Sequence, residues 1–188
     1  MGGMTDLPAD SRPYRVLVVC TGNICRSPMG EVVLREKLAD AGLADLVEVA
    51  SAGISDEEHG NPIDRRARAV LAEHGYPVPD HRAHQVAPGE LGRYDLALAM
   101  TNEHARALRR RADVDGTAST AQVRLWREFD ATAPHAAGAD DLDVPDPWFG
   151  SHEGFYDTLR VVQAGADGLV AHLRDVLAGR PGVTASPR

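Results

Sequence analysis

A run of aliphatic residues that ends in a cysteine constrains the fold of this chain more than any other segment. Residues 16–19 read VLVV, and Cys20 follows directly. A continuous β-branched and aliphatic run is typical of a strand that is buried on both faces of a parallel sheet. Cys20 then lies at the carboxyl end of that strand. In open α/β sheets this edge is where ligands bind.

A short loop follows, before a predicted helix. Its residues are Thr21, Gly22, Asn23, Ile24 and Cys25. Gly22 and Asn23 are the residue types that best tolerate positive φ, so the backbone can curl and point successive N–H groups at an anion. Ser27 is predicted as the N-cap and Pro28 as the first helical residue, which turns the positive end of the helix dipole toward the loop.

The residue types around Cys20 predict nucleophilic chemistry at phosphorus. A thiol beside an arginine and a helix N-terminus loses its proton readily, and the thiolate is the nucleophile. Arg26 follows Cys20 after five intervening residues, and its guanidinium can bind two phosphate oxygens at once. The Ser27 hydroxyl can donate a hydrogen bond to the sulfur. The alternative interpretation is a buried structural cysteine with an incidental arginine.

Residues 20–28, CTGNICRSP, resemble the Cys-x5-Arg-Ser signature of the low-molecular-weight protein tyrosine phosphatases. The resemblance runs from about Tyr14 to Ala178. It implies an α/β fold, a flavodoxin-like three-layer sandwich with a four-stranded parallel sheet. It also implies hydrolysis of phosphotyrosine through a phosphocysteine intermediate, without a cofactor. In the family, the cysteine that matches Cys25 can form a reversible disulfide with the nucleophile; a small packing residue is the alternative.

A second chemical segment lies near residue 146. Hydrolysis of a phosphate monoester needs a proton for the leaving group and later a base for water, and one carboxyl can do both. Asp146 lies between two prolines and before Trp148 and Phe149, so it stands on a stiff loop. The resemblance implies the same general acid, because the family's acid lies in an Asp-Pro-aromatic-aromatic segment. We expect Trp148 and Phe149 to form a wall for an aromatic substrate ring.

The resemblance also implies two supporting residues. His81 matches a family histidine that contacts the loop asparagine, here Asn23. Ser51 matches a serine that helps to hold the same loop. The segment around His81 departs from the family pattern at Asp80 and His84, where serine and arginine are frequent.

Two further features allow either a structural or a functional interpretation. The acidic loop Ile54–Gly60 is either solvated or forms a wall of the substrate pocket, in which case His59 belongs to that wall. His81 and His84 suggest a metal site, but no third or fourth ligand has suitable spacing, so we predict none. We expect Asp140, Asp141 and Asp143 to be solvated.

Hydrophobic periodicity and capping residues predict the remaining elements. Strands are predicted over 46–51, 94–100 and 122–129, and helices over 28–41, 61–75, 101–111 and 151–177. Residues 14–178 form the predicted phosphatase domain. Residues 1–13 and 179–188 are predicted to be a disordered N-terminal extension and a disordered tail.

Composition limits the partners and the compartment. A formal charge of −8 argues against nucleic acid or an anionic membrane as a partner. Two cysteines in one loop do not make a disulfide framework and fit a reducing compartment. Residues 1–13 hold no apolar core of signal-peptide length. We expect a cytoplasmic monomer that acts on a phosphotyrosine-containing protein.

Three alternatives stay open. An arsenate reductase of this fold needs a cysteine further downstream, and none follows Cys25. A protein arginine phosphatase shares most of the loop but has threonine where Ile24 stands, and it lacks the paired aromatic residues. An FMN-binding flavodoxin-like electron carrier uses a similar phosphate loop, but it has no use for Arg26 or Asp146.

Overall fold

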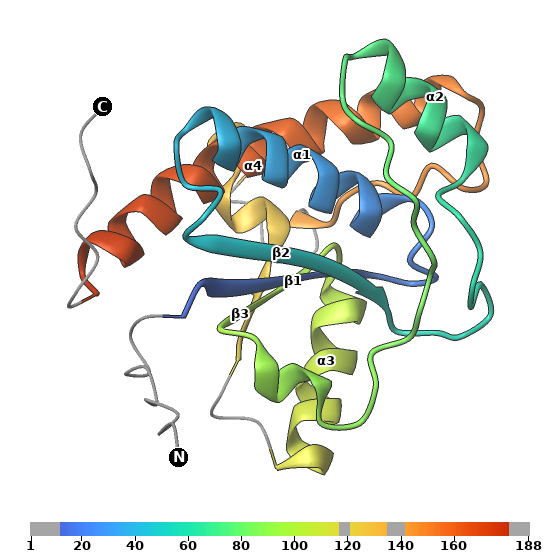
Figure 1. Cartoon of the computed structure of the whole chain (residues 1–188). Coiled ribbons are helices and arrows are strands. Elements are labelled where there is room, and N and C mark those ends of the chain that lie inside the picture. Colours follow the sequence, from blue (N-terminus) through green and yellow to red (C-terminus); the bar gives the residue numbers. More distant parts are fainter. Residues whose placement is uncertain (1–11, 117–120, 135–141, 181–188) are drawn as a thin grey trace, which may run out of the picture.

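Four parallel strands form the centre of the protein (Figure 1). The structure is a computed structural model, and it describes residues 12–116, 121–134 and 142–180. The strands are β1 (Tyr14–Cys20), β2 (Val47–Gly53), β3 (Leu96–Ala99) and β4 (Gln122–Leu125). Their order in the sheet is β2-β1-β3-β4, and all neighbouring pairs are parallel. The predicted α/β fold with a four-stranded parallel sheet is confirmed.

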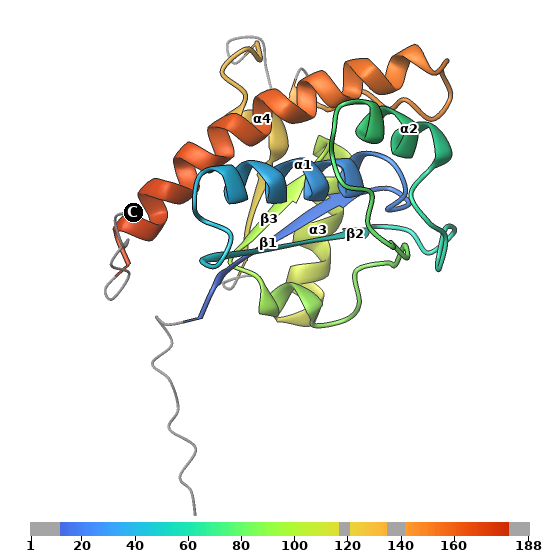
Figure 2. The ribbon, with the colours of Figure 1, turned by 45° about the horizontal axis from the view of Figure 1, so that its top comes forward.

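Helices cover both faces of this sheet. The long helices are α1 (Arg26–Asp40), α2 (Arg65–Glu73), α3 (Asn102–Asp115) and α4 (Glu153–Ala178), and two short 3₁₀ helices are η2 (Glu90–Arg93) and η3 (Trp126–Phe129). Figures 1 and 2 show α1, α2 and α4 together on one side of the sheet and α3 on the other. The result is the predicted three-layer sandwich.

Strand β1 contributes to two hydrophobic clusters because its side chains alternate between the faces. Val16 and Val18 pack on the side of α1 and α4, whereas Leu17 and Val19 pack on the side of α3. All four are completely buried. Each such side chain stabilises the fold by about 1.5–3 kcal/mol relative to an exposed one. The run is continuous because neither face of this central strand meets solvent.

The start of α1 differs from the prediction. The helix begins at Arg26, and Cys25 is its N-cap residue, without a side-chain capping hydrogen bond. The carbonyl of Cys25 accepts the first helical bond, from the Met29 N–H at 3.1 Å. Pro28 is therefore the third helical residue, where a missing N–H costs nothing. The expectation that Ser27 caps the helix was wrong, because its hydroxyl is used inside the loop.

Two other boundaries also differ. Helix α2 begins after Asp64, whose carboxylate accepts the Arg66 N–H at 2.8 Å, and not at the Asn61-Pro62 pair. The fourth strand ends at Leu125, because Trp126 turns inward and its Nε1–H donates to the Val162 carbonyl of α4 at 3.2 Å. Thr101 caps α3 as predicted, and it accepts the His104 N–H at 3.3 Å.

The two ends of the described chain lie on the same side of the molecule, where β1 begins (Figure 1). Arg12 pairs with Asp95 at 2.7 Å, and Arg180 lies 3.5 Å from the same carboxylate and 4.9 Å over the Tyr14 ring. These arginines were assigned to the flanking segments, but both pack on the domain. Residues 1–11 and 181–188, for which disorder was predicted, lie outside the described residues.

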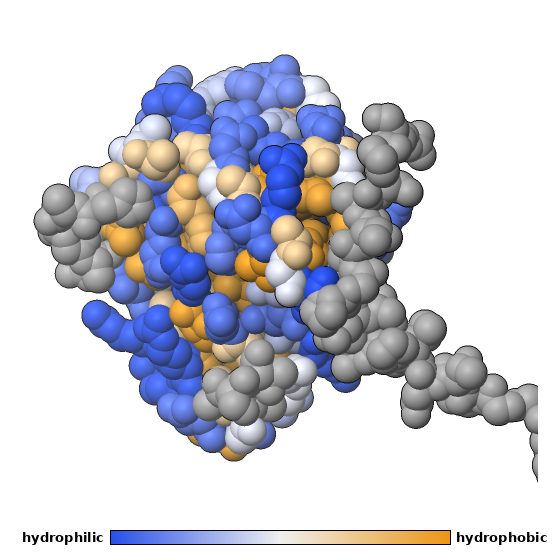
Figure 3. Space-filling model, turned by 90° about the vertical axis from the view of Figure 1, so that its left-hand side faces the viewer, coloured by the Kyte–Doolittle hydropathy of each residue, from blue (hydrophilic) through white to orange (hydrophobic). Residues whose placement is uncertain are grey.

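Figure 3 shows one side of the molecule, with hydrophobic residues near its middle and hydrophilic residues around and between them. Within the described ranges, no helix has the length and apolar character that crossing a membrane requires.

Helix α4 lies close to η3 at two glycines. A Cβ atom at Gly168 would lie 1.8 Å from the Phe129 carbonyl oxygen, and one at Gly165 would lie 2.3 Å from Trp126 Nε1. The two glycines therefore set the distance between α4 and η3.

We expect Gly168→Ala to lower the free energy of unfolding by about 1–3 kcal/mol, because a backbone carbonyl has to move to admit the methyl group. Chemical denaturation measures this loss. The matched control is Gly154→Ala in the same helix, where the nearest atoms would lie 3.8 Å away and alanine is the better helix former. Equal unfolding midpoints for the two variants would contradict the expectation.

Candidate active site

The loop between β1 and α1 lies at the carboxyl edge of the sheet and has one unusual backbone conformation. Asn23 has φ of 60°, the only positive φ of a non-glycine residue in the part of the chain that the structure describes. Gly22 does not have a positive φ there. A Cβ at this position would lie 2.9 Å from Cγ of Glu58, so that side chain would have to shift.

Asn23 is held from three directions. Its Nδ2 donates to the hydroxyls of Ser27 and Ser51, both at 3.0 Å. Its Oδ1 accepts the backbone N–H of His84 at 3.1 Å, and its carbonyl accepts from Nε2 of His81 at 2.7 Å. Asn23 and Ser27 are completely buried. The structure thus places Ser51 and His81 beside Asn23, as the sequence analysis expected.

The network continues beyond Ser51 to a residue that the sequence analysis missed. The Ser51 hydroxyl donates to Glu31 at 2.5 Å, and Glu31 also pairs with Arg35 at 2.9 Å. Glu31 stands on α1 one turn after Ser27. In the sequence, the signal for Glu31 is an acidic residue in the first two turns of the helix that follows an anion loop.

The sulfur of Cys20 lies within the same network. Its Sγ is 3.0 Å from Oγ of Ser27, and that hydroxyl is also 3.2 Å from the Ala52 carbonyl. A thiolate can only accept hydrogen bonds, so Ser27 is the donor once Cys20 ionises. The side chain that was predicted to cap the helix is therefore placed to donate a hydrogen bond to the sulfur of Cys20.

Arg26 and Asp146 meet although 120 residues separate them in the sequence. An Arg26 Nη2–H donates to Oδ2 of Asp146 at 2.9 Å. Two weaker bonds hold the guanidinium, from Nη1 to the Val144 carbonyl at 3.3 Å and from Nη2 to the Thr21 hydroxyl at 3.4 Å. Arg26 is only 5% exposed. Its charge is thus compensated inside the protein and faces the loop.

A pocket of about 180 Å³ opens over this loop. Its lining comprises Cys20, Thr21, Gly22, Ile24, Cys25, Arg26, Glu57, Glu58, Asp146, Trp148 and Phe149. The wall that the sequence analysis assigned to His59 is formed by Glu57 and Glu58. His59 is exposed, and its N–H closes a turn on the Asp56 carbonyl at 3.0 Å. The structure therefore corrects the placement of His59 in the pocket wall.

The aromatic side of the pocket is held by an arginine that the sequence analysis did not single out. Arg66 lies 5.5 Å over the Trp148 ring and 4.6 Å over the Phe155 ring, and it donates to the Trp148 carbonyl at 3.3 Å. Phe149 is 91% exposed, whereas Trp148 is 39% exposed. The pocket therefore has one fixed aromatic wall and one protruding ring, which suits a planar aromatic ligand.

The two cysteines differ in their surroundings. Both are free thiols and both are buried. Burial raises the pKa of the Cys25 thiol, and the negative charge of Asp64 raises it further. Cys25 therefore stays protonated at neutral pH and is a poor nucleophile. Cys20, by contrast, has the Ser27 hydroxyl as a donor for its thiolate.

His104 is a third residue that the sequence analysis missed. It is 2% exposed, and its Nε2 lies 2.9 Å from the Thr21 hydroxyl. Burial lowers its pKa to about 3, and the charge of Arg26 acts in the same direction. His104 is therefore neutral in the working range of pH. In the sequence, the signal for His104 is a polar residue in the buried stripe of α3 that continues through Leu108 and Ala112.

Asp143 is not merely solvated, as had been expected. It accepts the backbone N–H of Asn102 at 2.7 Å and the side-chain amide at 3.2 Å. This bond ties the loop that carries Asp146 to the start of α3. Asp140 and Asp141 lie outside the described residues.

His81 and His84 turn toward different partners. His84 lies 3.2 Å from Glu90, and this hydrogen bond raises its pKa. Among the residues that the structure describes, no group of three or more potential ligands is arranged to hold a metal ion.

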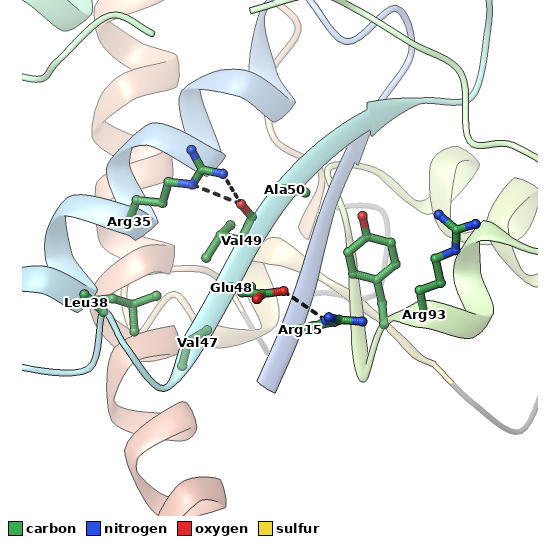
Figure 4. A pocket seen from close by; sticks show the side chains of 10 residues that line it. Arg15, Arg35, Leu38, Val47, Glu48, Val49, Ala50 and Arg93 are labelled. Carbon is green, nitrogen blue, oxygen red and sulfur yellow. Dashed lines mark hydrogen bonds and ion pairs between the residues drawn. The ribbon is translucent and has the colours of Figure 1, made fainter. Parts of the chain in front are cut away.

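A larger hollow, of about 630 Å³, lies along the edge strand β2 (Figure 4). Arg35 donates to the Val49 carbonyl there, and Arg15 pairs with Glu48 at 2.9 Å. Its lining contains no thiol. The smaller pocket, where a nucleophile, a cation and an acid converge, is therefore the candidate active site.

We expect Asn23→Ala to lower the free energy of unfolding by about 1–3 kcal/mol, since the hydroxyls of Ser27 and Ser51 and the backbone N–H of His84 each lose a hydrogen bond. Alanine also tolerates a positive φ less well than asparagine. Asn23→Gly removes the same bonds without the backbone strain, so its loss will be smaller. Denaturant unfolding compares the two variants. Wild-type stability of Asn23→Ala would contradict this account of the loop.

The family and its relatives were identified by comparison with known proteins. A family model described as low molecular weight phosphotyrosine protein phosphatase matches residues 15–177. A low molecular weight protein-tyrosine-phosphatase of Streptomyces coelicolor is 48% identical over 89% of this chain and 98% of its own length. Low molecular weight protein-tyrosine phosphatase A of Mycobacterium tuberculosis is 42% identical over 85% of this chain and 91% of its own.

Solved structures agree with these relatives. A protein tyrosine phosphatase of Entamoeba histolytica superimposes with a TM-score of 0.77 at 26% identity, covering 87% of this chain and 98% of that one. Vibrio vulnificus Wzb, solved in complex with benzylphosphonate, gives a TM-score of 0.67 at 31% identity, with 85% and 98% covered.

Proposed function

The chain belongs to the low molecular weight protein tyrosine phosphatase family, and on that premise we propose the role of each site residue in its reaction. The enzyme hydrolyses phosphotyrosine in proteins, as its family does. Cys20 is the nucleophile, Arg26 and the N–H groups of residues 21–26 bind the phosphoryl oxygens, and Asp146 is the general acid and base. The observation that carries this assignment is the convergence of Cys20, Arg26 and Asp146 in one pocket.

In the first step the Cys20 thiolate attacks phosphorus, so that an S–P bond forms while the bond from phosphorus to the tyrosine oxygen breaks. Asp146 takes up a proton from solvent once it has left Arg26, and it transfers this proton to the departing phenolate oxygen. Arg26 and the loop N–H groups stabilise the negative charge on the non-bridging oxygens. The Arg26–Asp146 ion pair of the empty enzyme gives way in this step, since the incoming phosphate dianion replaces the carboxylate as the partner of the guanidinium.

In the second step water attacks phosphorus, and Asp146, now a carboxylate, takes its proton. The S–P bond breaks and the electron pair returns to sulfur. Ser27, at 3.0 Å from Sγ, donates a hydrogen bond to the departing thiolate. The products are inorganic phosphate and the enzyme in its starting state.

The pocket favours phosphotyrosine over shorter phosphorylated side chains. Trp148 and Phe149 flank its opening, and Cys20 lies at its base with 3% exposure. An aromatic ring spans this depth and stacks against the walls, whereas the side chain of phosphoserine is shorter and apolar contact is lost. Ile24 also lines the pocket and offers no hydroxyl for a phosphoarginine side chain. Benzylphosphonate in the related Wzb structure is an aromatic ligand of the same kind.

We also propose an oligomeric state and a cellular location for the enzyme. We propose that the enzyme acts as a monomer, because the pocket that one chain forms already holds the nucleophile, the cation and the acid. A dimer in light scattering would contradict this. The catalytic thiol has to stay reduced, so we assign the enzyme to the cytoplasm. Recovery of the native protein from an extracytoplasmic fraction would overturn that assignment.

We expect Cys20→Ser to abolish turnover, and Asp146→Asn to slow it by roughly 10²–10⁴. The loss in Asp146→Asn will depend on the leaving group. Aryl phosphates whose phenols are strongly acidic need little protonation and will lose least. Steady-state kinetics over a series of aryl phosphates measures this slope. A loss that is equal for all leaving groups would contradict the role of Asp146 as the acid.

We expect a phosphotyrosine peptide to be hydrolysed with a kcat/KM at least about 100-fold above those of matched phosphoserine and phosphoarginine peptides, because only the first fills the aromatic part of the pocket. Phosphate release in the presence of a chelator provides the comparison. The control is Trp148→Ala, which will narrow the difference between phosphotyrosine and phosphoserine. A preference for phosphoarginine would identify the alternative arginine phosphatase activity.

A further inference from the structure

We propose that His104 is a positioning residue of the phosphatase reaction, which acts through the Thr21 hydroxyl to hold the Arg26 guanidinium in place while Asp146 performs proton transfer. This inference rests on the proposed function. It concerns a side chain that lines no part of the pocket and comes from α3, an element to which no catalytic role has been assigned.

The contacts form a chain from a buried ring to the catalytic arginine. Nε2 of His104 lies 2.9 Å from Oγ1 of Thr21, and the same oxygen accepts a hydrogen bond from Nη2 of Arg26 at 3.4 Å. Nδ1 of His104 is buried and has no hydrogen-bond partner among the described residues. All hydrogen bonding of the ring is therefore directed at Thr21.

A buried histidine with one nitrogen that makes no hydrogen bond lowers the stability of the fold, because an unsatisfied buried polar atom destabilises a protein by about 1–3 kcal/mol. A leucine at position 104 would continue the stripe of Leu108 and Ala112 without that cost. The hydrogen bond to Thr21 is thus the one feature of this ring that an apolar residue would not supply. Such local costs are typical of residues retained for function.

The chemistry gives this bond a use. In the empty enzyme Nη2 of Arg26 has two side-chain partners, Asp146 and Thr21. Asp146 has to leave the guanidinium to serve the tyrosine oxygen and then the attacking water. Thr21 is then the side chain that still orients Nη2. A threonine hydroxyl rotates freely unless a second partner fixes it. His104 is that partner.

His104 acts in its neutral form. The buried ring has no solvent to stabilise a positive charge, and the charge of the nearby Arg26 guanidinium also opposes protonation of the ring. It therefore does not transfer the proton itself. Its contribution is geometric, and it will be largest where the phosphoryl oxygens bind most strongly, in the five-coordinate transition state.

The proposal is tested by measuring kcat/KM on a phosphotyrosine substrate for four variants. These are His104→Leu, His104→Gln, Thr21→Val and the double variant His104→Leu with Thr21→Val. We expect His104→Leu and Thr21→Val each to lower kcat/KM about tenfold, the usual worth of one hydrogen bond to a charged group. The double variant will lose no more than either single variant, because both break one chain of contacts. His104→Gln, whose amide reaches the position of Nε2, will recover to within about threefold of wild type.

Inhibition constants separate positioning from damage to the fold. Orthovanadate adopts the five-coordinate geometry of the transition state, and inorganic phosphate resembles the product. In His104→Leu the inhibition constant of vanadate will rise about tenfold and that of phosphate less. A partly unfolded preparation has fewer active molecules but unchanged inhibition constants. The matched control is His172→Leu on α4, which packs against Phe129 and will keep the wild-type kcat/KM.

Three results would overturn the proposal. These are a kcat/KM within twofold of wild type in His104→Leu, losses that multiply in the double variant, or an unchanged vanadate constant. Failure of the proposed function is a different result. In that case the wild-type enzyme would hydrolyse phosphotyrosine no faster than Cys20→Ser does.

Discussion

The buried positive charge of Arg26 is the constraint on which the site depends. A guanidinium that is 5% exposed has lost most of its water, and such a charge is tolerated only when a partner and further hydrogen bonds compensate it. In the empty enzyme Asp146 supplies the negative charge at 2.9 Å. In the proposed reaction the substrate phosphate supplies it during catalysis. The pocket therefore always holds an anion, and exchanging one anion for the other releases the carboxyl for proton transfer.

The loop that faces this charge is rigid because other elements hold it. Asn23 stands in a conformation that asparagine tolerates and most residues avoid. Its amide bonds to Ser27 on α1 and to Ser51 on β2, and the segment with His81 and His84 closes over it. In the proposed function these contacts orient the N–H groups of the loop before any substrate arrives. Preorganised dipoles of this kind stabilise a transition state without reorganisation at the moment of reaction.

The sequence was informative where a residue type has few alternatives and silent where position depends on packing. Buried aliphatic residues before Cys20 require a central strand, and Asp146 between prolines marks a stiff loop. Ser27 was misassigned because a serine before a proline is also a good cap, and only the fold shows that its hydroxyl is needed at the sulfur. His59 lay in the right loop, but the turn at Asp56 exposes it. His104 was hidden within an apolar stripe, since burial of its ring is decided by the packing of α3.

The meeting of Arg12 and Arg180 at Asp95 has a practical consequence. Strands β1 and β3 begin there, whereas the pocket opens where β1 ends. Both routes out of the domain thus leave from the rear of the catalytic surface. A bead, an electrode or a second protein that is attached at Arg12 or Arg180 would therefore lie away from the opening of the pocket.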